Sequence, residues 1–343
     1  MGTALSQTKF VNTYVGFIVI WSLERLLFFD QLWAFALLNT IAQYLFIPLP
    51  ILLVIPIWRR HRQSLAKLSI PTIIFVALFG RLFLPPLPGT AQSSTQPPLT
   101  VMSFNVLFKN KNYKAIAGSI QIASPDIVGL QEITDDVAQE LVNVLESDYP
   151  YHTLDTSEQY STVALLSRFP IEHLERFPLP PLHKALQAVI NINGQRIHVF
   201  VVHLSPNQFF EQPIAEFVPT VKERYARRAN EIALLRARIV DIDEPVLLLC
   251  DCNLTDTSEA HAQFSTFLVD SFGESGWGFG HTFQPPITSA AIQRIDYIWH
   301  SSEFKALEAY VGQDGQSDHL PVVAKLGFVT IPHERSAHDK NDS

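Results

Sequence analysis

Acidic, amide and imidazole side chains recur at the ends of apolar runs between residues 99 and 328. In chain order, the candidates for chemistry are Asn105, Glu132, His203, Asp251, Asn253, Asp296, Asp318 and His319. Taken singly, most of them are typical of a solvated turn or a hydrogen-bonded core position. Asp251 fits this description poorly, because a carboxylate buried in an apolar run requires a partner or a metal. Together, these residues have the composition of a catalytic site.

This set of side chains is suited to metal-assisted hydrolysis of a phosphate ester. Oxygen ligands with few histidines favour Mg²⁺, with Mn²⁺ as an alternative. A histidine paired with an aspartate is held in one tautomer, and amide and imidazole donors stabilise charge on phosphoryl oxygens. The sequence has no G-x-S-x-G elbow and no G-x-x-x-x-G-K-[ST] loop. These absences argue against an elbow-type serine hydrolase and a P-loop NTPase.

The elements that must position these residues are predicted from the apolar patterning. Strands are predicted at 99–108, 126–133, 162–167, 185–192, 196–204, 245–254, 294–300 and 321–328, and helices at 112–123, 134–147, 220–240 and 258–267. Helices and strands interleave, and several neighbouring strands could pair as hairpins. The pattern predicts an α/β domain with mixed sheets rather than a purely parallel one.

Within the run 245–254, alternate residues face opposite sides of a strand. Asp251 and Asn253 therefore share one face, and Cys250 and Cys252 share the other. We expect the two cysteines to face the interior and not to pair, because a disulfide between residues i and i+2 would be strained. Two cysteines in the whole chain exclude a disulfide framework and a cysteine-based zinc module.

The first ninety residues differ in composition from the rest of the chain. They contain nine charged residues, seven of them basic, whereas the remaining 253 residues carry a formal net charge of −13. Three apolar segments, at 10–29, 31–58 and 68–86, are long enough to cross a bilayer, which takes about 20 residues. We therefore predict about three transmembrane helices. The middle segment has the strongest signal, with 28 uncharged residues and prolines that predict kinks near its far end.

The loop Arg59-Arg60-His61-Arg62 is the most basic short segment near these helices. The positive-inside rule places it in the cytoplasm and the rest of the chain on the outer side of the inner (cytoplasmic) membrane. Glu24 and Arg81 have equal predicted depths and are expected to pair within the membrane. The predicted organisation is an anchor at 1–87, a linker at 88–98, a catalytic domain at 99–329 and a disordered tail at 330–343.

Six motifs, in order, resemble those of the endonuclease/exonuclease/phosphatase family. They are Ser103-Phe104-Asn105-Val106, Leu130-Gln131-Glu132, Val202-His203-Leu204, Cys250-Asp251-Cys252-Asn253, Arg294-Ile295-Asp296-Tyr297-Ile298 and Ser317-Asp318-His319-Leu320-Pro321. The resemblance covers roughly residues 99–328. It implies a four-layer α/β sandwich, in which two mixed β-sheets are flanked by helices.

The resemblance also implies a metal site and a phosphate site. Glu132 matches the main metal ligand, with Asn105 and Asp318 beside the ion. Leu107 stands where some nucleases of the family carry an acid, which argues against a second metal ligand and an abasic-site nuclease. Cys250 and Cys252 replace a glycine and an aromatic residue that flank the fourth motif in many members.

The other matched residues would act on the substrate. Asn253 and His203 resemble the groups that hold the scissile phosphate. Asp251 is similar to the carboxylate that orients or deprotonates the attacking water. His319, supported by Asp296, resembles the histidine that acts as a base or stabilises the transition state. Which of Asp251 and His319 accepts the proton stays open at the level of sequence.

The charge of the domain bears on the substrate. Nucleic-acid binding uses many Lys and Arg contacts to phosphates, and His183, Lys184, Arg168 and Arg294 are too few to form a convincing groove. Membrane attachment favours a lipid-linked phosphate, and the architecture resembles bacterial membrane-bound family members linked to glycopeptide resistance, which implies a lipid pyrophosphate. The alternatives are an extracytoplasmic nuclease and a catalytically inactive membrane sensor. Head group, bond type and oligomeric state are left open.

Two loops are candidates for substrate contact. The segment 209–217, just past His203, is rich in phenylalanine and could touch lipid, form a lid or pack on the domain. The segment 277–283, rich in glycine and aromatic residues, resembles the variable substrate loop of the family.

Overall fold

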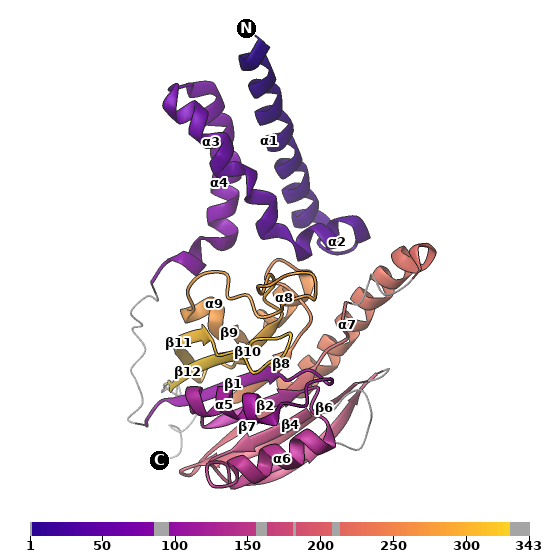
Figure 1. Ribbon diagram of the computed structural model, residues 1–343, viewed down its shortest axis with the longest axis vertical. Helices are drawn as coiled ribbons and strands as arrows, with labels where there is room; N and C mark the ends of the chain where they lie inside the picture. The colour runs from indigo at the N-terminus through magenta and orange to yellow at the C-terminus, as the bar shows by residue number, and fades with distance from the viewer. Residues whose placement is uncertain (1, 86–95, 156–162, 181–182, 208–212, 330–343) are drawn as a thin grey trace, which may run out of the picture.

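The computed structural model describes residues 2–85, 96–155, 163–180, 183–207 and 213–329. Most of the predicted linker at 88–98 and the predicted tail at 330–343 lie outside the described residues, as do residues 209–212 of the predicted substrate segment 209–217. Residues 2–85 form an N-terminal helical region that stands beside a domain of two sheets and their helices (Figure 1).

The N-terminal helical region contains two helices that are long and apolar enough to cross a membrane, at Thr8–Phe28 and Arg62–Phe83. Its elements are α1 (Gly2–Phe28), α2 (Trp33–Thr40), η1 (Ala42–Phe46), α3 (Pro48–Trp58), α4 (Arg62–Phe79) and η2 (Gly80–Phe83). Helix α4 packs against both α1 and α3, and in Figure 1 all three point away from the domain.

The middle predicted segment is a bent pair rather than one straight span. Helix α2 and the segment Ala42–Trp58 meet at an angle of 77°, at Ile41. The break is therefore not at the prolines, and Pro56 lies inside α3. Polar side chains near the break provide a physical reason: Thr40 bonds the Tyr225 hydroxyl and Tyr44 donates to the Ile292 carbonyl. These residues are polar but uncharged, so the uncharged run in the sequence gave no sign of a break at this point.

The predicted pair of Glu24 and Arg81 is wrong. Arg81 instead donates to the backbone carbonyls of Leu84, Pro85 and Glu274. Both carboxylate oxygens of Glu24 are buried without a hydrogen-bond partner among the described residues. The basic side chain extends to the sheet domain, where carbonyl acceptors are available.

Two six-stranded sheets form the core of the domain. The first has the order β11-β12-β1-β2-β4-β3 and the second β5-β6-β7-β8-β10-β9. The strands are β1 (Leu99–Asn105), β2 (Ile127–Gln131), β3 (Tyr151–Asp155), β4 (Val163–Ser167), β5 (Ile171–Leu179), β6 (His183–Ile192), β7 (Gln195–His203), β8 (Val246–Asp251), β9 (Val269–Asp270), β10 (Asp296–His300), β11 (Phe304–Val311) and β12 (Val322–Phe328). Each sheet contains one parallel pair, β1 with β2 and β7 with β8, so both are mixed as predicted.

Helices cover the outer faces of both sheets. The helices of the domain are α5 (Tyr113–Ala123), α6 (Asp135–Leu145), η4 (Ile214–Glu216), α7 (Phe217–Ile239), α8 (Glu259–Phe264) and α9 (Ser271–Ser275). One apolar cluster fills the space between the sheets, a second joins the first sheet to α5 and α6, and a third joins the second sheet to α7 and α8. The predicted architecture of two mixed sheets flanked by helices is confirmed.

The close contact between the sheets depends on Gly129 in β2. A Cβ at this position would lie 2.8 Å from Leu249 Cβ in β8 and 3.2 Å from Val201 Cγ1 in β7. Such a contact is too short for any larger side chain without a shift of the backbone. The glycine therefore lets the two parallel pairs approach each other, and their ends carry the candidate site.

Candidate active site

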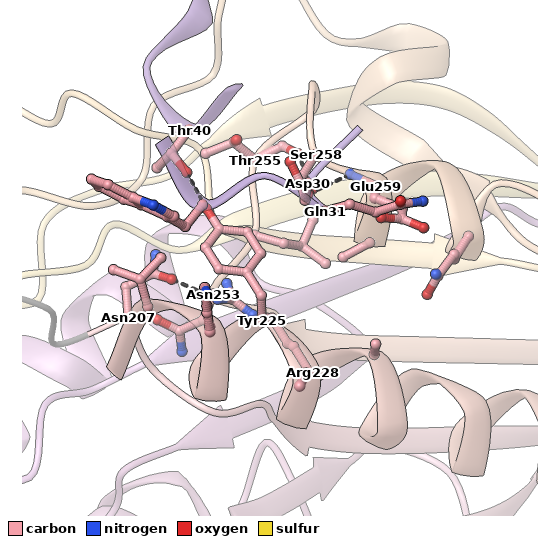
Figure 2. A pocket seen from close by; sticks show the side chains of 18 residues that line it. Asp30, Gln31, Thr40, Asn207, Tyr225, Arg228, Asn253, Thr255, Ser258 and Glu259 are labelled. Atoms are coloured by element: carbon pink, nitrogen blue, oxygen red, sulfur yellow. Dashed lines mark hydrogen bonds between the residues drawn. The ribbon is translucent and has the colours of Figure 1, made fainter. Parts of the chain in front are cut away.

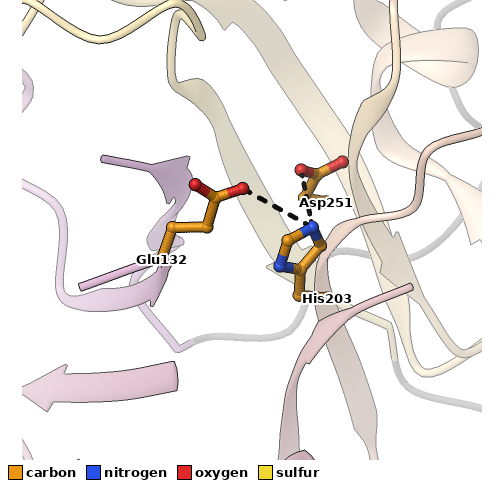
Figure 3. Close-up of side chains that lie close together, drawn as sticks. All are labelled: Glu132, His203 and Asp251. Atoms are coloured by element: carbon orange, nitrogen blue, oxygen red, sulfur yellow. Dashed lines mark ion pairs between the residues drawn. The ribbon is translucent and has the colours of Figure 1, made fainter. Parts of the chain in front are cut away.

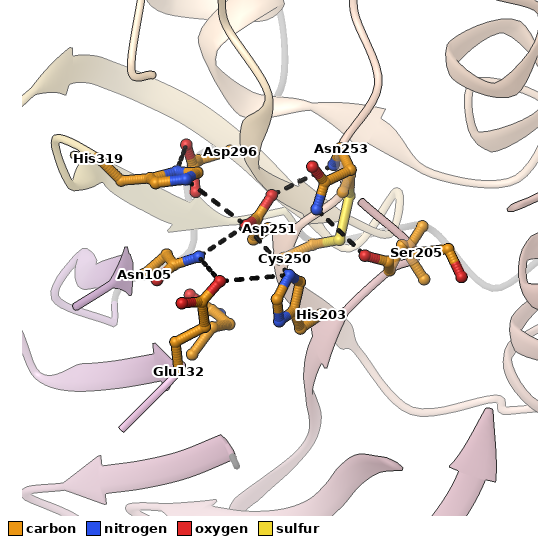
Figure 4. A network of polar contacts seen from close by, with 12 residues as sticks. Asn105, Glu132, His203, Ser205, Cys250, Asp251, Asn253, Asp296 and His319 are labelled. Atoms are coloured by element: carbon orange, nitrogen blue, oxygen red, sulfur yellow. Dashed lines mark hydrogen bonds and ion pairs between the residues drawn. A yellow bond between two sulfur atoms is a disulfide. The ribbon is translucent and has the colours of Figure 1, made fainter. Parts of the chain in front are cut away.

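All eight predicted site residues lie at one edge of the paired sheets. Asn105 and His203 end β1 and β7, Asp251 ends β8, and Glu132 follows β2 directly. Asp296 begins β10, which runs antiparallel to β8 with Asp296 opposite Asp251. Asp318 and His319 precede β12, which runs antiparallel to β1, so the loop before it reaches the same edge. Figure 4 shows six of these side chains directed toward Asp251 or its neighbours.

Asp251 lies at the centre of the network and is 1% exposed. Its Oδ2 accepts a hydrogen bond from Asn105 Nδ2 at 2.8 Å and lies 3.4 Å from His203 Nε2 and 3.9 Å from His319 Nε2. Its Oδ1 accepts from the Asn253 backbone N–H at 3.2 Å. Burial and the nearby Asp296 carboxylate raise the pKa of Asp251.

His319 is oriented by Asp296. The Nδ1 atom of His319 lies 2.8 Å from Asp296 Oδ2, and both residues are buried. Burial disfavours the imidazolium, but the carboxylates of Asp296 and Asp251 outweigh it and raise the pKa of His319 to about 10. The aspartate fixes the ring so that Nε2 faces Asp251, as the sequence hypothesis of a supported histidine requires.

Glu132 is held by two donors, one at the end of β1 and one in the loop that follows it. Asn105 Nδ2 donates to its Oε1 at 3.0 Å, and the Phe108 N–H donates to its Oε2 at 3.1 Å. Burial opposes the negative charge, but His203 and these donors together lower the pKa of Glu132. Glu132 adopts φ 56°, an uncommon conformation for a non-glycine residue that recurs at functional sites.

The described residues contain two groups with metal-ligand spacing. One is Glu132, His203 and Asp251, shown in Figure 3, and the other is Asp251, Asp296 and His319. Glu132 belongs to the first group, whereas Asp318, which we predicted as a ligand, belongs to neither. His203 was predicted to hold phosphate, and its proximity to Glu132 (3.8 Å) adds a possible metal contact.

Asp318 has the character of a carboxylate that lacks a counter-ion. Its Oδ1 is buried with no hydrogen-bond partner among the described residues. Burial raises its pKa, His319 lowers it, and repulsion from Glu132 and Asp251 raises it further, so the net direction is upward. Several anionic oxygens close together match the preference of Mg²⁺ for hard oxygen ligands. The oxygen donors of Asn105, Glu132 and Asp318 are therefore chemically suited to a divalent cation, and of the three carboxylate and amide residues Glu132 also belongs to a group with metal-ligand spacing.

Asn253 and His203 lie on the second-sheet side of the site. Asn253 Nδ2 donates to the Leu204 carbonyl at 3.1 Å, and its backbone has φ 51°. Both side chains are buried beside Asp251. They are thus placed where polar hydrogens could contact a substrate oxygen, and the phosphate-holding role stays a prediction.

Several supporting residues were missed at the level of sequence. The Ser317 hydroxyl donates to the Asn105 carbonyl at 2.8 Å and joins the His319 loop to β1. The Thr282 hydroxyl accepts from the Asp296 N–H at 3.3 Å, and the Phe283 ring packs 5.1 Å from the His319 ring. Ser317 belongs to the last motif, and Thr282 and Phe283 belong to the predicted substrate loop 277–283, so the sequence marked all three positions without assigning them these supporting contacts.

The segment 277–283 divides its side chains between two partners. Phe283 packs on His319, whereas Phe279 contacts Phe79 and Phe83 and Trp277 contacts Phe83. The expected substrate loop therefore also fastens the domain to the N-terminal helical region.

The two cysteines lie away from the candidate site, as predicted, but the prediction that they do not pair is wrong. Cys250 and Cys252 are fully buried in the cluster against α7 and α8. They form a disulfide, which we did not expect between residues i and i+2. The expectation failed because Cys252 lies beyond the end of β8, where the chain leaves the strand and the two Cα atoms are 5.1 Å apart, within the usual range for a disulfide.

Two candidate cations for a nucleic-acid groove are engaged elsewhere. Arg294 is buried and forms ion pairs with Asp256 and Asp270. Arg168 pairs with Asp126 and donates to Ser124. The buried Arg294 is therefore not available to a phosphate backbone, and the partly exposed Arg168 already has an acidic partner.

The chain belongs to the endonuclease/exonuclease/phosphatase family, whose sequence pattern matches residues 102–319. Its members include phosphodiesterases, phosphatases and nucleases that depend on divalent metals. Among solved structures, the chain is similar to a family protein from Bacteroides vulgatus, with 18% identity over 68% of this chain and 100% of that one and a TM-score of 0.56.

Two further solved structures share this fold. The human Nocturnin catalytic domain with bound sulfate is 20% identical over 69% of this chain and 97% of that one, with a TM-score of 0.52. A mannosyl-6-phosphatase from Bacteroides thetaiotaomicron is 19% identical over 67% and 100%, with a TM-score of 0.52. Among curated proteins, no sequence matched the chain. Identities this low establish the fold, and the substrate has to be argued from the site.

Proposed function

We propose that this chain is a membrane-anchored, Mg²⁺-dependent phosphohydrolase of a bacterial type. Its catalytic domain lies outside the cytoplasm and acts on a lipid-linked phosphate or pyrophosphate. One observation carries the proposal: the edge of the sheets that bears Asp251 and Asn253 also bears the contacts to the N-terminal helical region. Hydrolytic chemistry and an apolar anchor therefore meet at one place in the molecule.

The anchor contacts are polar and directional. Arg25 Nε donates to the Thr257 carbonyl at 3.0 Å, four residues beyond Asn253. Asp30 Oδ2 accepts from the Glu259 N–H at 2.7 Å, at the start of α8. Hydrogen bonds of this kind fix an orientation that apolar packing alone leaves free. A substrate held in the bilayer would therefore meet a site in fixed register with the membrane surface.

The residues of this chain suggest how hydrolysis would proceed. Asn105, Glu132 and Asp318 would hold the divalent cation, which supplies charge stabilisation to a bound phosphate. Asn253 and His203 would contact the scissile phosphoryl oxygens. Their donors would stabilise the charge that develops on those oxygens in the transition state.

Asp251 and His319 would act on the attacking water. The 3.9 Å separation between Asp251 Oδ2 and His319 Nε2 is too long for a direct hydrogen bond. A water or phosphoryl oxygen placed between them could contact both groups. Asp296 is a positioning residue, because it holds the far side of the imidazole and does not face this gap.

An extracytoplasmic nuclease is the second candidate, and the observations favour it less. Residues 91–343 carry a net charge of −13. Arg168 and Arg294 each form an ion pair with an aspartate. Non-specific binding to nucleic acid depends on cations that are available to phosphates.

The test uses the full chain in lipid vesicles with Mg²⁺ and offers a long-chain prenyl diphosphate and duplex DNA side by side. His319→Gln is the inactive control. Phosphate release from the lipid that is lost in the control is the expected result. Cleavage of DNA alone would replace the lipid proposal by the nuclease. Hydrolysis of neither substrate would contradict both and favour the inactive sensor.

A further inference from the structure

A cavity of about 260 Å³ lies between the N-terminal helical region and the domain. One wall comes from the segment that follows α1 and includes Asp30, Trp33 and Thr40, and the other comes from α7 and the loop after β8. Asn253 of the candidate site lines the cavity, as do Asn207 and Arg228 (Figure 2). The cavity therefore connects the chemistry to the part of the chain nearest the proposed membrane.

Arg228 is the unusual member of this lining. The residue is 3% exposed, and its Nη2 donates to Asn207 Oδ1 at 2.7 Å. Its Nε is buried without a hydrogen-bond partner, and no carboxylate of the described residues forms an ion pair with it. A buried guanidinium without an ion pair is costly unless another anion balances its charge.

The surroundings hold Arg228 in place and only partly balance its charge. Burial lowers the pKa of Arg228, and the nearby Tyr225, Glu231 and Asp30 oppose that decrease without reversing it. The guanidinium carbon lies 5.0 Å from the centroid of the Tyr225 ring, a geometry in which an aromatic face positions a guanidinium. Tyr225 in turn bonds Thr40 and donates to the Ala36 carbonyl of the N-terminal helical region. The arginine is thus fixed by contacts that cross the cavity from both walls.

The acid in the opposite wall is already satisfied. Asp30 Oδ1 accepts from Asn39 Nδ2 at 2.8 Å, and its Oδ2 accepts from the Glu259 N–H. These bonds tie the segment after α1 to the start of α8. Asp30 therefore serves the structure. It favours the charge of Arg228 from a distance, as do the buried Glu231 and Asp251, but forms no ion pair with it, so the unpaired Arg228 Nε is left for a ligand.

We propose that this cavity binds the lipid-proximal phosphate of a membrane-embedded pyrophosphate, with Arg228 as the anion-binding residue. This inference rests on the proposed function and extends it by naming the bond that is cut. The terminal phosphate lies at Asn253 and the metal ligands, and the proximal phosphate lies in the cavity toward the lipid. Guanidinium groups suit this role because they donate two parallel hydrogen bonds to a phosphate.

The reaction that follows is hydrolysis of the anhydride. Water adds to the terminal phosphorus and its proton passes to the site base. The bond between that phosphorus and the bridging oxygen breaks, and the electron pair stays on the lipid-bound phosphate. The products are inorganic phosphate and a lipid monophosphate. Arg228 faces the oxygen that gains charge, so it stabilises the leaving group and the ground state together.

The first experiment measures binding and does not require hydrolysis. The full chain in vesicles is titrated with methylenediphosphonate, a non-hydrolysable pyrophosphate analogue, and with inorganic phosphate. Arg228→Gln is expected to weaken binding of the diphosphonate at least tenfold and to change the affinity for inorganic phosphate less than threefold. Arg227→Gln is the matched control, since Arg227 is the neighbouring residue of α7 and pairs with Glu223 at the surface.

The second experiment measures turnover of a prenyl diphosphate and of bis(p-nitrophenyl) phosphate, which has no second phosphate. Arg228→Gln is expected to lower kcat/KM for the diphosphate 10- to 100-fold and to change kcat/KM for the diester less than threefold. Arg228→Lys is expected to restore part of the kcat/KM for the diphosphate. Thermal unfolding of each variant checks that the fold is kept. Equal diphosphonate affinity in Arg228→Gln and Arg227→Gln overturns the inference, even where the lipid is hydrolysed. Selective loss of diphosphonate binding without any lipid hydrolysis supports the cavity and instead contradicts the proposed function.

Discussion

Asp296 begins β10 and His319 lies in the loop before β12, and the two side chains meet at 2.8 Å, Oδ2 to Nδ1, at the buried edge of the two sheets. The contact leaves Nε2 of the imidazole directed at Asp251. Because the ring has one partner on each side, its tautomer and its direction are both set by carboxylates. The pair therefore behaves as a unit, which makes its energetics testable.

Replacement of Asp296 by Asn should lower kcat for phosphate hydrolysis by ~10²–10⁴, with KM within threefold, because the imidazole loses its orientation and the support of its charge. The same loss is expected in His319→Gln. The double variant should be no slower than His319→Gln alone, since residues that act as a unit are not additive. Additive losses in steady-state kinetics would show that Asp296 and His319 work independently.

Glu132→Gln should abolish activation by Mg²⁺ and Mn²⁺, because the amide supplies one neutral oxygen in place of an anionic carboxylate. The wild-type chain should show a rise in Tm when Mg²⁺ is added, and the variant should lose that rise. Glu140→Gln, at an exposed position of α6, is the control and should respond as the wild type does. An undiminished shift in Glu132→Gln would remove Glu132 from the metal site.

The buried pair of Asp270 and Arg294 predicts a pH dependence of stability. Burial opposes ionisation of Asp270, but Arg294 at 2.8 Å outweighs it and lowers the pKa of Asp270 below 3.8. A depressed carboxylate pKa contributes stability above the unfolded-state pKa and loses it as the pH falls. Asp270→Asn should therefore cost about 3–5 kcal/mol at pH 7.

The difference between wild type and Asp270→Asn should shrink below about pH 4, where the unfolded aspartate takes up its proton. Denaturant unfolding at a series of pH values measures this directly. Asp243→Asn, an exposed acid near the end of α7, should change stability little at any pH. A constant gap between wild type and Asp270→Asn down to pH 3 would contradict the electrostatic account.

Asp30 should contribute to the attachment of the N-terminal helical region to the domain. Its two oxygens accept from Asn39 and from the Glu259 N–H, so Asp30→Ala leaves two donors without their partner. The expected cost is about 1–3 kcal/mol per buried donor. In thermal unfolding of the full chain, Asp30→Ala should have a lower Tm than the control Asp148→Ala, which changes an exposed residue. Equal Tm values would mean that water replaces both bonds.

The layered fold and the gathering of the site could be predicted because both depend on local patterns. Apolar runs located eight of the strands, and a polar residue at the end of each run marked Asn105, His203 and Asp251. The strand β11 was missed because its burial alternates imperfectly across a β-bulge between Ala306 and Glu308. A periodicity of two, interrupted in this way, gives a weak sequence signal.

Contacts between distant segments could not be predicted from such patterns. Arg81 reaches the Glu274 carbonyl, 193 residues away, and Thr40 reaches Tyr225, 185 residues away. The contacting groups are a backbone carbonyl and a tyrosine hydroxyl, and neither carries a charge that would mark the contact in the sequence. The role of Arg228 could not be predicted either, because its cavity forms only where α7 meets the segment after α1.

The arrangement of the helices makes the proposed membrane orientation testable. The end of α1 and the segment η2, which follows α4, both contact the domain: Arg25 donates to the Thr257 carbonyl, and the Leu82 carbonyl accepts from the Gly278 N–H. The loop from Arg59 to Arg62, between α3 and α4, lies at the far end of the helical region (Figure 1). If α1 and α4 both cross the bilayer, this loop and the domain lie on opposite sides.

The positive-inside rule then puts the loop in the cytoplasm. In a bacterial host, an alkaline phosphatase that requires export should be active when fused after residue 343 and inactive when fused after Arg60. A green fluorescent protein that requires the cytoplasm should give the reverse pattern. The result after Arg60 depends on α2 and the segment Ala42–Trp58, because this bent pair must return the chain across the bilayer for Arg60 to lie in the cytoplasm. Active phosphatase at both positions would mean that the segment Ala42–Trp58 does not cross, and inactive phosphatase after residue 343 would place the catalytic domain in the cytoplasm.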